Sequence, residues 1–258
     1  MKRLSDYLHT YPEFALERTD GVLHLRLHSG GQAFRWSASA HRLLGDVLQD
    51  IDADPENRVL LLSGTGEDFC GAIDLSSFKG VGWDVVTWEG KRYLSALLGL
   101  EIPVVAAVQG RCTIHAEIPL LSDIVLASTS AVFGDTTHFS RNVVPGDGTH
   151  VLWTTLLGPN GGRYLLMGEQ LLTAQEALQA RVVGEVLEPE ALLPRAWEHA
   201  RRLAAKPSVV ARNTRTALIR PLKAAFDDGL AIGLALQGAA YGNRPHRGEV
   251  PVEDDERI

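Results

Sequence analysis

The 258-residue sequence has little of several features that define particular classes of protein. Its two cysteines, Cys70 and Cys112, are too few and too far apart for a disulfide framework or a CxxC metal site. Asp and Glu (32) outnumber Lys and Arg (25), and the formal net charge of −7 disfavours a broad nucleic-acid-binding face. No apolar run approaches the ~20 residues of a membrane span, and charges interrupt the N-terminus before a signal-peptide core. These absences predict a cytoplasmic protein without nucleic-acid or membrane partners.

The first half of the chain alternates strand-like with helix-like patterns. Residues 23–27 alternate Leu with His24 and Arg26, as a half-exposed strand does. Continuous apolar runs separated by helical segments indicate a parallel sheet that is covered on both faces. The apolar runs lie at 58–66, 103–110 and 123–128, and the helical segments at 39–51 and 88–100.

The second half is predicted to be mostly helical, because its apolar residues recur at helical spacing. Thr173 and Glu176 form a capping box that begins a predicted helix over 173–186. Shorter helical segments are predicted at 151–158 and 161–168, and two longer helices at 189–207 and 208–242, the second broken or kinked at Pro221.

Three segments have the order and character of a known family. Residues 64–78 read GTGEDFCGAIDLSSF, 106–128 read AAVQGRCTIHAEIPLLSDIVLAS, and 132–158 read VFGDTTHFSRNVVPGDGTHVLWTTLLG. Together they resemble the two oxyanion-hole segments and the FG…PG block of the crotonase (enoyl-CoA hydratase/isomerase) superfamily. The likeness extends over residues ~10–240. It implies an α/β fold with a crotonase-type ββα spiral core and a C-terminal helical trimerisation region.

The resemblance also implies how the chain is organised. Residues 1–190 would form the spiral core with the active site, 191–245 a C-terminal helical arm, and 246–258 a flexible charged tail. The arm is rich in apolar residues, which agrees with a face buried on a neighbouring subunit. We therefore expect a homotrimer or a dimer of trimers.

The sequence departs from the CoA-thioester members of this family at their catalytic positions. Their second oxyanion segment carries a run of glycines, which lets the backbone approach the thioester oxygen closely. Thr113–Ala116 replaces that run here. Glu117 keeps one hydratase acid, but Thr137 stands where the second is expected, beside His138. A two-glutamate centre for water addition is therefore incomplete.

The same departures resemble a smaller branch, the β-diketone hydrolases typified by 6-oxocamphor hydrolase. The resemblance implies retro-Claisen hydrolysis of a carbon–carbon bond in a small alicyclic diketone, with no CoA, metal or organic cofactor. The histidine and aspartate that this branch pairs map to His138 and Asp147, and its further histidine maps to His115. A branch tryptophan maps to Trp36, whereas Gln237 replaces a glutamate of the C-terminal helix.

The residue types at these positions suit the hydrolysis of a 1,3-diketone. Imidazole, with an ordinary pKa near ~6.5, is matched to taking a proton from water at neutral pH, and a carboxylate beside it fixes the tautomer. His138 is thus the expected base and Asp147 its partner. A loop histidine bound to backbone and a turn or capping aspartate are the alternatives. His115 is expected to donate to the oxyanion or enolate or to protonate the enolate carbon, unless it is a buried histidine satisfied by backbone.

Other residues are candidates for the walls of the site. Trp36 offers an indole N–H and an apolar wall, or plain packing, and Trp83 and Trp88 form a lid over substrate or pack on a trimer surface. Glu117 is either a ligand-shaping carboxylate or a buried acid paired with backbone donors. Ile73 is expected to supply backbone at the first oxyanion turn. His150 is expected to face the helix behind it, and solvated positions are expected for His24, His28, His41, His199 and His246.

Two other functions compete with diketone hydrolysis. An acyl-CoA hydratase or isomerase with an altered acid set needs cationic residues near the first oxyanion turn, where Lys79 is the only basic residue of AIDLSSFKG. A catalytically silent crotonase-fold protein would be expected to have lost the His138 and Asp147 pair, and both residues are present.

Overall fold

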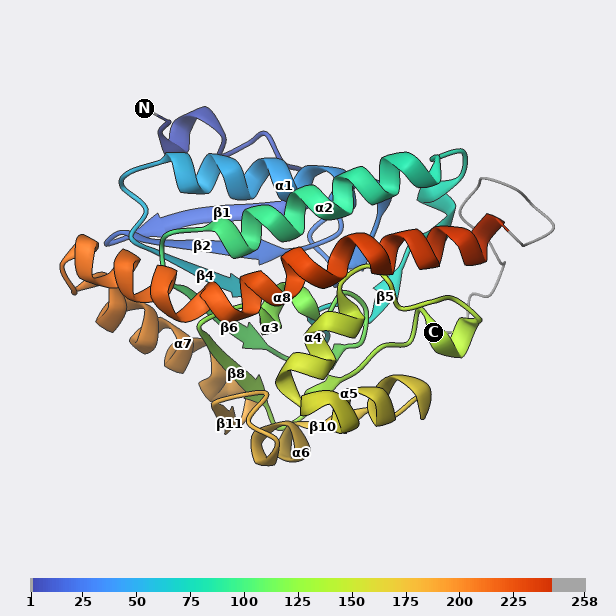
Figure 1. The fold of residues 1–258 in the computed structure, drawn as a ribbon. Helices are drawn as coiled ribbons and strands as arrows, with labels where there is room; N and C mark the ends of the chain where they lie inside the picture. Colours follow the sequence, from blue (N-terminus) through green and yellow to red (C-terminus); the bar gives the residue numbers. More distant parts are fainter. Residues whose placement is uncertain (1, 243–258) are drawn as a thin grey trace.

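The computed structural model describes residues 2–242. A six-stranded sheet forms the centre of the molecule (Figure 1). β1 runs antiparallel to β2 and all other neighbours are parallel. β4 and β6 are buried at every residue, as expected where helices cover both faces, so the predicted parallel sheet is confirmed. The strand order is β1 (Phe14–Thr19), β2 (Val22–Leu27), β4 (Val59–Ser63), β6 (Val104–Val108), β8 (Ile124–Ser128), β11 (Glu185–Leu187).

One face of this sheet is covered by α7 (Pro189–Ala204). Its buried residues Leu192, Ala196, Ala200 and Ala204 recur every four positions, so they lie on one side of the helix. Small alanine side chains let the helix pack closely on the strands. The predicted arm over 191–245 thus begins with a helix that covers this chain's own core. These helix residues form one apolar cluster with strand residues Val22, Val59, Leu61, Val105, Ala107 and Leu126.

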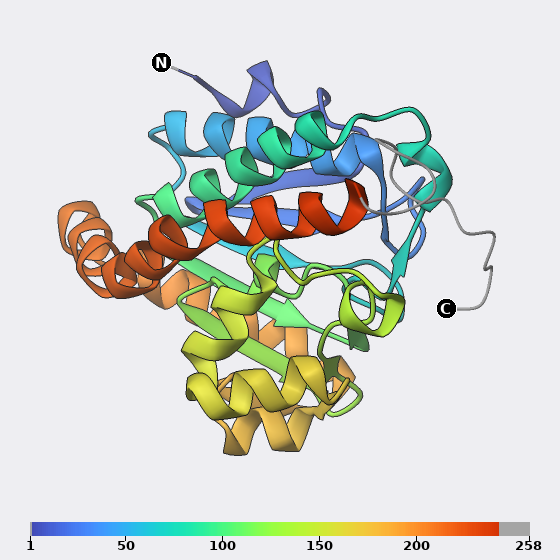
Figure 2. The ribbon, with the colours of Figure 1, turned by 45° about the vertical axis from the view of Figure 1, so that its right-hand side comes forward.

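The opposite face is covered by three long helices, α1 (Ala38–Ala53), α2 (Trp83–Gly99) and α8 (Ser208–Gly242), which lie side by side in Figures 1 and 2. Ser37 caps α1 by accepting a hydrogen bond from the backbone N–H of Ala40. α8 continues through Pro221, and Figure 2 shows its orange N-terminal part turning away from the red remainder. The helix therefore bends but does not break.

Short elements connect the sheet to these helices. β3 (Arg35–Trp36) pairs with β5 (Ala72–Ile73), and β9 (Val132–Phe133) lies between β7 (Arg111–Cys112) and β10 (Leu172–Thr173). Cys70 and Cys112 are both buried and free. The other helices are α3 (Glu117–Leu120), α4 (Thr149–Leu156), α5 (Gly158–Met167), α6 (Ala174–Gln179) and the 3₁₀ turns η1 (Leu4–Asp6), η2 (Leu75–Phe78) and η3 (Phe139–Arg141).

The helix predicted over 173–186 is only partly correct. The capping box of Thr173 and Glu176 is confirmed, but α6 ends at Gln179. Arg181 then has a left-handed φ of 59°, and the chain continues into β11. The β-branched and glycine residues after Arg181 disfavour helix, and pairing with β8 supplies the hydrogen bonds that the helix would have made.

The prediction of a half-exposed strand over 23–27 is also wrong. Every residue of β2 except Arg26 is buried. The His24 ring lies edge-on to Trp197 of α7, and its nitrogens lie 3.0 Å from Glu17 Oε1 and 2.7 Å from Ser63 Oγ. His24 is therefore buried and hydrogen-bonded, not solvated.

The predicted tail over 246–258, with His246, lies outside the described residues. Within residues 2–242, no helix combines the length and the apolar character that crossing a membrane requires.

Candidate active site

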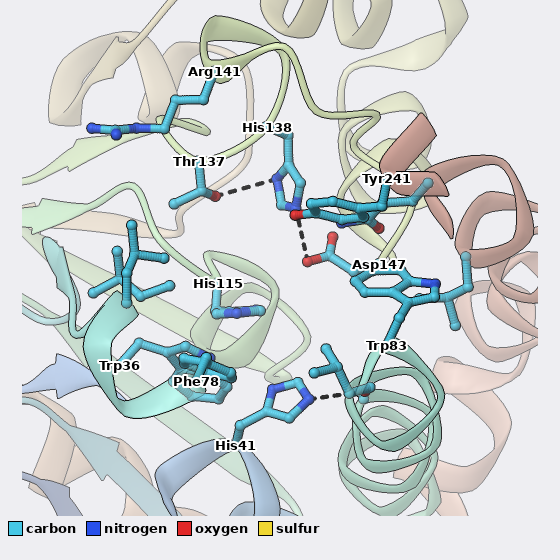
Figure 3. A pocket seen from close by; sticks show the side chains of 16 residues that line it. Trp36, His41, Phe78, Trp83, His115, Thr137, His138, Arg141, Asp147 and Tyr241 are labelled. Carbon is cyan, nitrogen blue, oxygen red and sulfur yellow. Dashed lines mark hydrogen bonds and ion pairs between the residues drawn. The ribbon is translucent and has the colours of Figure 1, made fainter. Parts of the chain in front are cut away.

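A cavity of about 100 Å³ lies between the β3–β5 pair, α2, the loop around η3 and α8. Figure 3 shows three histidines and one aspartate whose side chains face this space from different elements. Apolar side chains form much of the remaining wall, and Thr137, Arg141, Gln237 and Tyr241 add polar groups to it. The apolar residues are Trp36, Ile73, Leu75, Phe78, Trp83, Val86 and Leu234. The cavity thus combines mainly apolar walls with a few titratable groups, as binding sites for small molecules do.

His138 is held between two carboxylates. Its Nε2 lies 3.0 Å from Asp147 Oδ2, so the expected proximity of these two residues is found in the structure (Figure 3). Its Nδ1 lies 3.0 Å from both carboxylate oxygens of Asp135, a residue that the sequence interpretation did not select. The only sequence signal for Asp135 is its place three residues before the histidine, in the loop after β9.

The charges around His138 determine its protonation. Burial lowers the pKa of its imidazole, but Asp147 and Asp135 outweigh burial and hold the pKa well above its ordinary value. Burial conversely raises the pKa of Asp147, yet the neighbouring His138 lowers it below the usual range. At rest the geometry therefore favours an imidazolium shared by two ionised carboxylates.

The turn that carries Asp147 needs glycine on both sides. A Cβ on Gly146 would lie 2.1 Å from the Gly233 carbonyl oxygen of α8, and one on Gly148 would lie 2.9 Å from the Phe226 ring. Gly148 also has a φ of 109°, which non-glycine residues rarely adopt. The Pro-Gly-Asp-Gly turn is thus pressed against α8, and this contact fixes Asp147 at the cavity.

His115 forms a second pair of histidine and carboxylate. Its Nδ1 lies 2.5 Å from Glu117 Oε1, and Tyr93 Oη lies 3.1 Å from the same nitrogen. Burial lowers the pKa of His115, but Glu117 outweighs it and the net shift is upward. His115 adopts a left-handed φ of 50°, in the segment where the CoA-thioester members use glycine. Such a conformation costs a non-glycine residue on the order of 1–2 kcal/mol, which the ion pair and the surrounding packing offset.

Trp36 packs against this second pair. Its ring centroid lies 4.1 Å from that of His115, and the residue is 1% exposed while lining the cavity. β3 places it there, because its pairing with β5 sets Trp36 beside Ile73. Ile73 also lines the cavity, which agrees with the position expected for the first oxyanion turn.

His41 is a cavity residue that the sequence interpretation placed wrongly in solvent. It lies on α1, is 4% exposed and lines the cavity. Its Nε2 lies 3.0 Å from the Val86 carbonyl oxygen, so that nitrogen donates, and its Nδ1 has no hydrogen-bond partner among the described residues. Burial lowers the pKa of His41 to about 4. His41 is buried by α2, and the local sequence pattern of α1 carries no information about that contact.

α8 and α2 close one end of the cavity. Gln237 of α8 is buried, and its Oε1 has no partner within residues 2–242. Trp83 of α2 lines the cavity and packs on Tyr241, with ring centroids 4.7 Å apart. Trp88, one turn later, is 57% exposed, stacks with Arg92 and lies outside the cavity lining, so a direct substrate contact from Trp88 is not supported.

Two further expectations are decided by packing. Glu117 lies behind His115 and does not line the cavity, and its partners are the side chains of His115 and Tyr93, not the backbone donors that were one alternative. His150 faces α8 as expected, with Nε2 3.3 Å from the Gly229 carbonyl oxygen. Within the described part of the chain, no group of three His, Cys, Asp or Glu side chains is placed to hold a metal ion.

The comparison with protein families agrees with this arrangement. Residues 17–244 match the family model of enoyl-CoA hydratase/isomerase. The chain belongs to this family, and the resemblance to the crotonase superfamily is confirmed. A short-chain-enoyl-CoA hydratase from Clostridium acetobutylicum is 30% identical over 212 residues, which cover 78% of each chain.

Solved structures add a finer likeness. A β-diketone hydrolase from the cyanobacterium Anabaena sp. PCC 7120, bound to (S)-3-oxocyclohexyl acetic acid, is 41% identical with a TM-score of 0.89. That match covers 91% of this chain and 96% of the other. An enoyl-CoA hydratase/isomerase from Mycobacterium paratuberculosis has the same fold, with a TM-score of 0.82 at 20% identity over 89% of this chain and 93% of the other. The likeness to the β-diketone hydrolase branch is therefore confirmed.

Proposed function

We propose that this protein hydrolyses a carbon–carbon bond of a cyclic or bicyclic β-diketone by retro-Claisen chemistry. The observation that carries the proposal is the placement of His138 and Asp147, 3.0 Å apart, at a cavity with apolar walls. A base beside a water-sized space and a container for an alicyclic ring are what this reaction requires. The Anabaena enzyme supports the substrate class, since its bound molecule carries one ketone and one carboxylate, the groups that hydrolysis of a bicyclic 1,3-diketone produces.

The first step is attack of water on one carbonyl carbon. The His138 and Asp147 pair takes a proton from the water, and the carbonyl becomes a tetrahedral oxyanion. The imidazole serves as base only after it has lost the proton it holds at rest, because neighbouring carboxylates raise its pKa. The rate is therefore expected to rise with pH through the raised pKa of His138.

The second step breaks the bond between the tetrahedral carbon and the central carbon of the diketone. The electron pair moves to the second carbonyl as an enolate. The central carbon then gains a proton equivalent to the one that His138 took from water, which regenerates the base and completes a keto acid with the elements of water added. His115, held by Glu117 and facing the cavity, is the proposed donor to this developing negative charge. Trp36 and Ile73 are proposed to bound the same end of the substrate.

A CoA-thioester reaction is the competing assignment, because relatives such as the Clostridium acetobutylicum hydratase act on enoyl-CoA by name. His115 occupies the segment in which those enzymes use glycine, and its imidazole fills space near the second oxyanion position. Thr137 lines the cavity where the second acid is expected and supplies no carboxylate. These differences favour the diketone.

The test is turnover of a panel of cyclic and bicyclic 1,3-diketones and, separately, crotonyl-CoA, followed by loss of the enol or enoyl chromophore. We expect turnover of at least one diketone and a loss of ~100-fold or more in His138→Ala, because general base catalysis contributes on that order. His9→Ala, at an exposed position, is the matched control. Turnover of crotonyl-CoA alone would contradict the proposal.

A further inference from the structure

Asp135 lies on the far side of His138 from the cavity. Both of its carboxylate oxygens are 3.0 Å from His138 Nδ1, and its side chain is 6% exposed. The backbone N–H and the hydroxyl of Thr137 each donate to Asp135 Oδ1 over 3.0 Å. Asp135 is absent from the cavity lining, but it contacts two residues that line it, His138 and Thr137.

We propose that Asp135 is a positioning residue, which holds the Nδ1–H of His138 so that the proton lost from the imidazolium is the one on Nε2, next to Asp147. Nε2 and the Asp147 carboxylate then both accept hydrogen bonds from the attacking water. The inference rests on the proposed role of His138 as base and goes beyond it, because it assigns the two ring nitrogens separate tasks. In this scheme the catalytic pair of His138 and Asp147 has a third member, Asp135, which orients the ring and takes up no proton.

The chemistry of imidazole requires such a partner. A neutral imidazole carries one N–H and one lone pair, and a ring that holds its hydrogen on Nε2 cannot accept a proton there. A carboxylate on Nδ1 selects the useful tautomer and stabilises the imidazolium that forms when water gives up its proton. Thr137 in turn fixes the carboxylate, since it donates two hydrogen bonds to one oxygen.

The charges that face His138 come from several elements. Asp135 and Asp147 are negative and raise the pKa of His138, while His138 itself lowers the pKa of the neighbouring His115. Arg141 of η3 also lines the cavity, and Figure 3 shows its guanidinium directed away from Asp147. The neighbouring His138 lowers the pKa of Asp135 despite burial, so Asp135 is ionised. Its removal takes one negative charge from beside the imidazole.

The substitution Asp135→Asn separates charge from shape. We expect kcat on a diketone to fall by about 10- to 100-fold with KM changed less than about 3-fold, because Asp135 does not touch substrate. The acid limb of the pH–rate profile should move to lower pH by about one unit, since an opposite charge near a histidine shifts its pKa by at least that much. Asp135→Glu keeps the charge on a longer side chain and should leave the limb within about 0.3 units while lowering kcat.

A second measurement does not depend on turnover. The pKa of His138 can be followed by NMR in protein with ¹⁵N-labelled histidine. Asp135→Asn should lower this pKa, and a larger fraction of the neutral ring should carry its proton on Nε2. Glu185→Gln is the matched control, because Glu185 holds His199 at 2.7 Å on another part of the sheet and should change only the His199 signal. An unchanged pKa and tautomer of His138 in Asp135→Asn would overturn the proposal, even if kcat fell. If no diketone is turned over by the native protein, the proposed function fails, whereas the NMR result still decides the role of Asp135.

Discussion

His138 and His41 line the same cavity, yet their surroundings are opposite. His138 has a carboxylate on each ring nitrogen, whereas His41 has one backbone carbonyl and a second nitrogen without a partner among the described residues. Both residues are buried, but the pKa of His138 is raised well above the ordinary value and that of His41 is lowered to about 4. Burial alone therefore does not decide whether these two histidines carry charge, because the two carboxylates at His138 outweigh it and no carboxylate pairs with His41 among the described residues.

The same difference has opposite consequences for stability. The folded protein binds a proton at His138 more tightly than the unfolded chain does, so this residue stabilises the fold below its unfolded pKa, and the contribution is lost as pH rises through its folded pKa. His41 binds its proton less tightly when folded, so it destabilises the fold as pH falls from about 6.5 towards about 4. One cavity thus holds a histidine suited to proton transfer and one that stays neutral.

The largest expected effect separates two of the carboxylates that pair with cavity histidines, Asp147 and Glu117. Asp147 lines the cavity and Glu117 does not. Asp147→Asn should lower kcat/KM on a diketone by ~100-fold or more, because it removes the carboxylate that supports the base His138. Glu117→Gln should lower kcat/KM by about 10-fold, because Glu117 acts through His115. Steady-state kinetics on both variants, with circular dichroism as the folding control, measure the difference. Equal losses would mean that the two pairs share one task.

A smaller effect concerns the neutral histidine. His41→Phe keeps an aromatic ring and removes the titrating group. Protonation of residue 41 in the unfolded chain therefore no longer lowers the stability of the variant between pH 7.5 and pH 5. The native protein should lose about 2 kcal/mol more than the variant over that range, from a folded pKa of about 4 against about 6.5 unfolded. Urea unfolding at both pH values measures this difference. His9→Phe, at an exposed position, is the control, and identical pH dependence in His41→Phe and native protein would contradict the assignment.

The smallest effect is expected at Gln237, where the diketone branch has a glutamate. If that position works by orienting groups through hydrogen bonds, Gln237→Glu should change turnover by less than ~10-fold, about 1.4 kcal/mol in barrier. The new negative charge should raise the pKa values of His138 and His115 and move the acid limb of the pH–rate profile to higher pH. Gln179→Glu, on an exposed part of α6, is the matched control. A gain of ~100-fold or more on bicyclic diketones would show that charge matters at this position.

Much of the fold followed from local pattern. The apolar runs became β4, β6 and β8, and the helical periods became α1 and α2, because a buried strand and an amphipathic helix are each encoded in a short window of sequence. The family motifs also located His138, Asp147, His115 and Trp36, all of which the structure brings to one cavity. What the sequence by itself determined was therefore the order of elements and the segments that carry the site.

Only the tertiary structure decided the surroundings of each side chain. His24 and His41 sit in windows that look half polar, and they are buried because α7 and α2, which are distant in sequence, pack over them. In the sequence Asp135 has no feature beyond that of a loop aspartate, and only the folded turn places its carboxylate at His138. Trp83 and Trp88 share one helix, yet α8 covers only the first. The physical reason is that burial and charge pairing depend on neighbours in space, so the pKa values that determine the chemistry of this cavity arise only when the chain has folded.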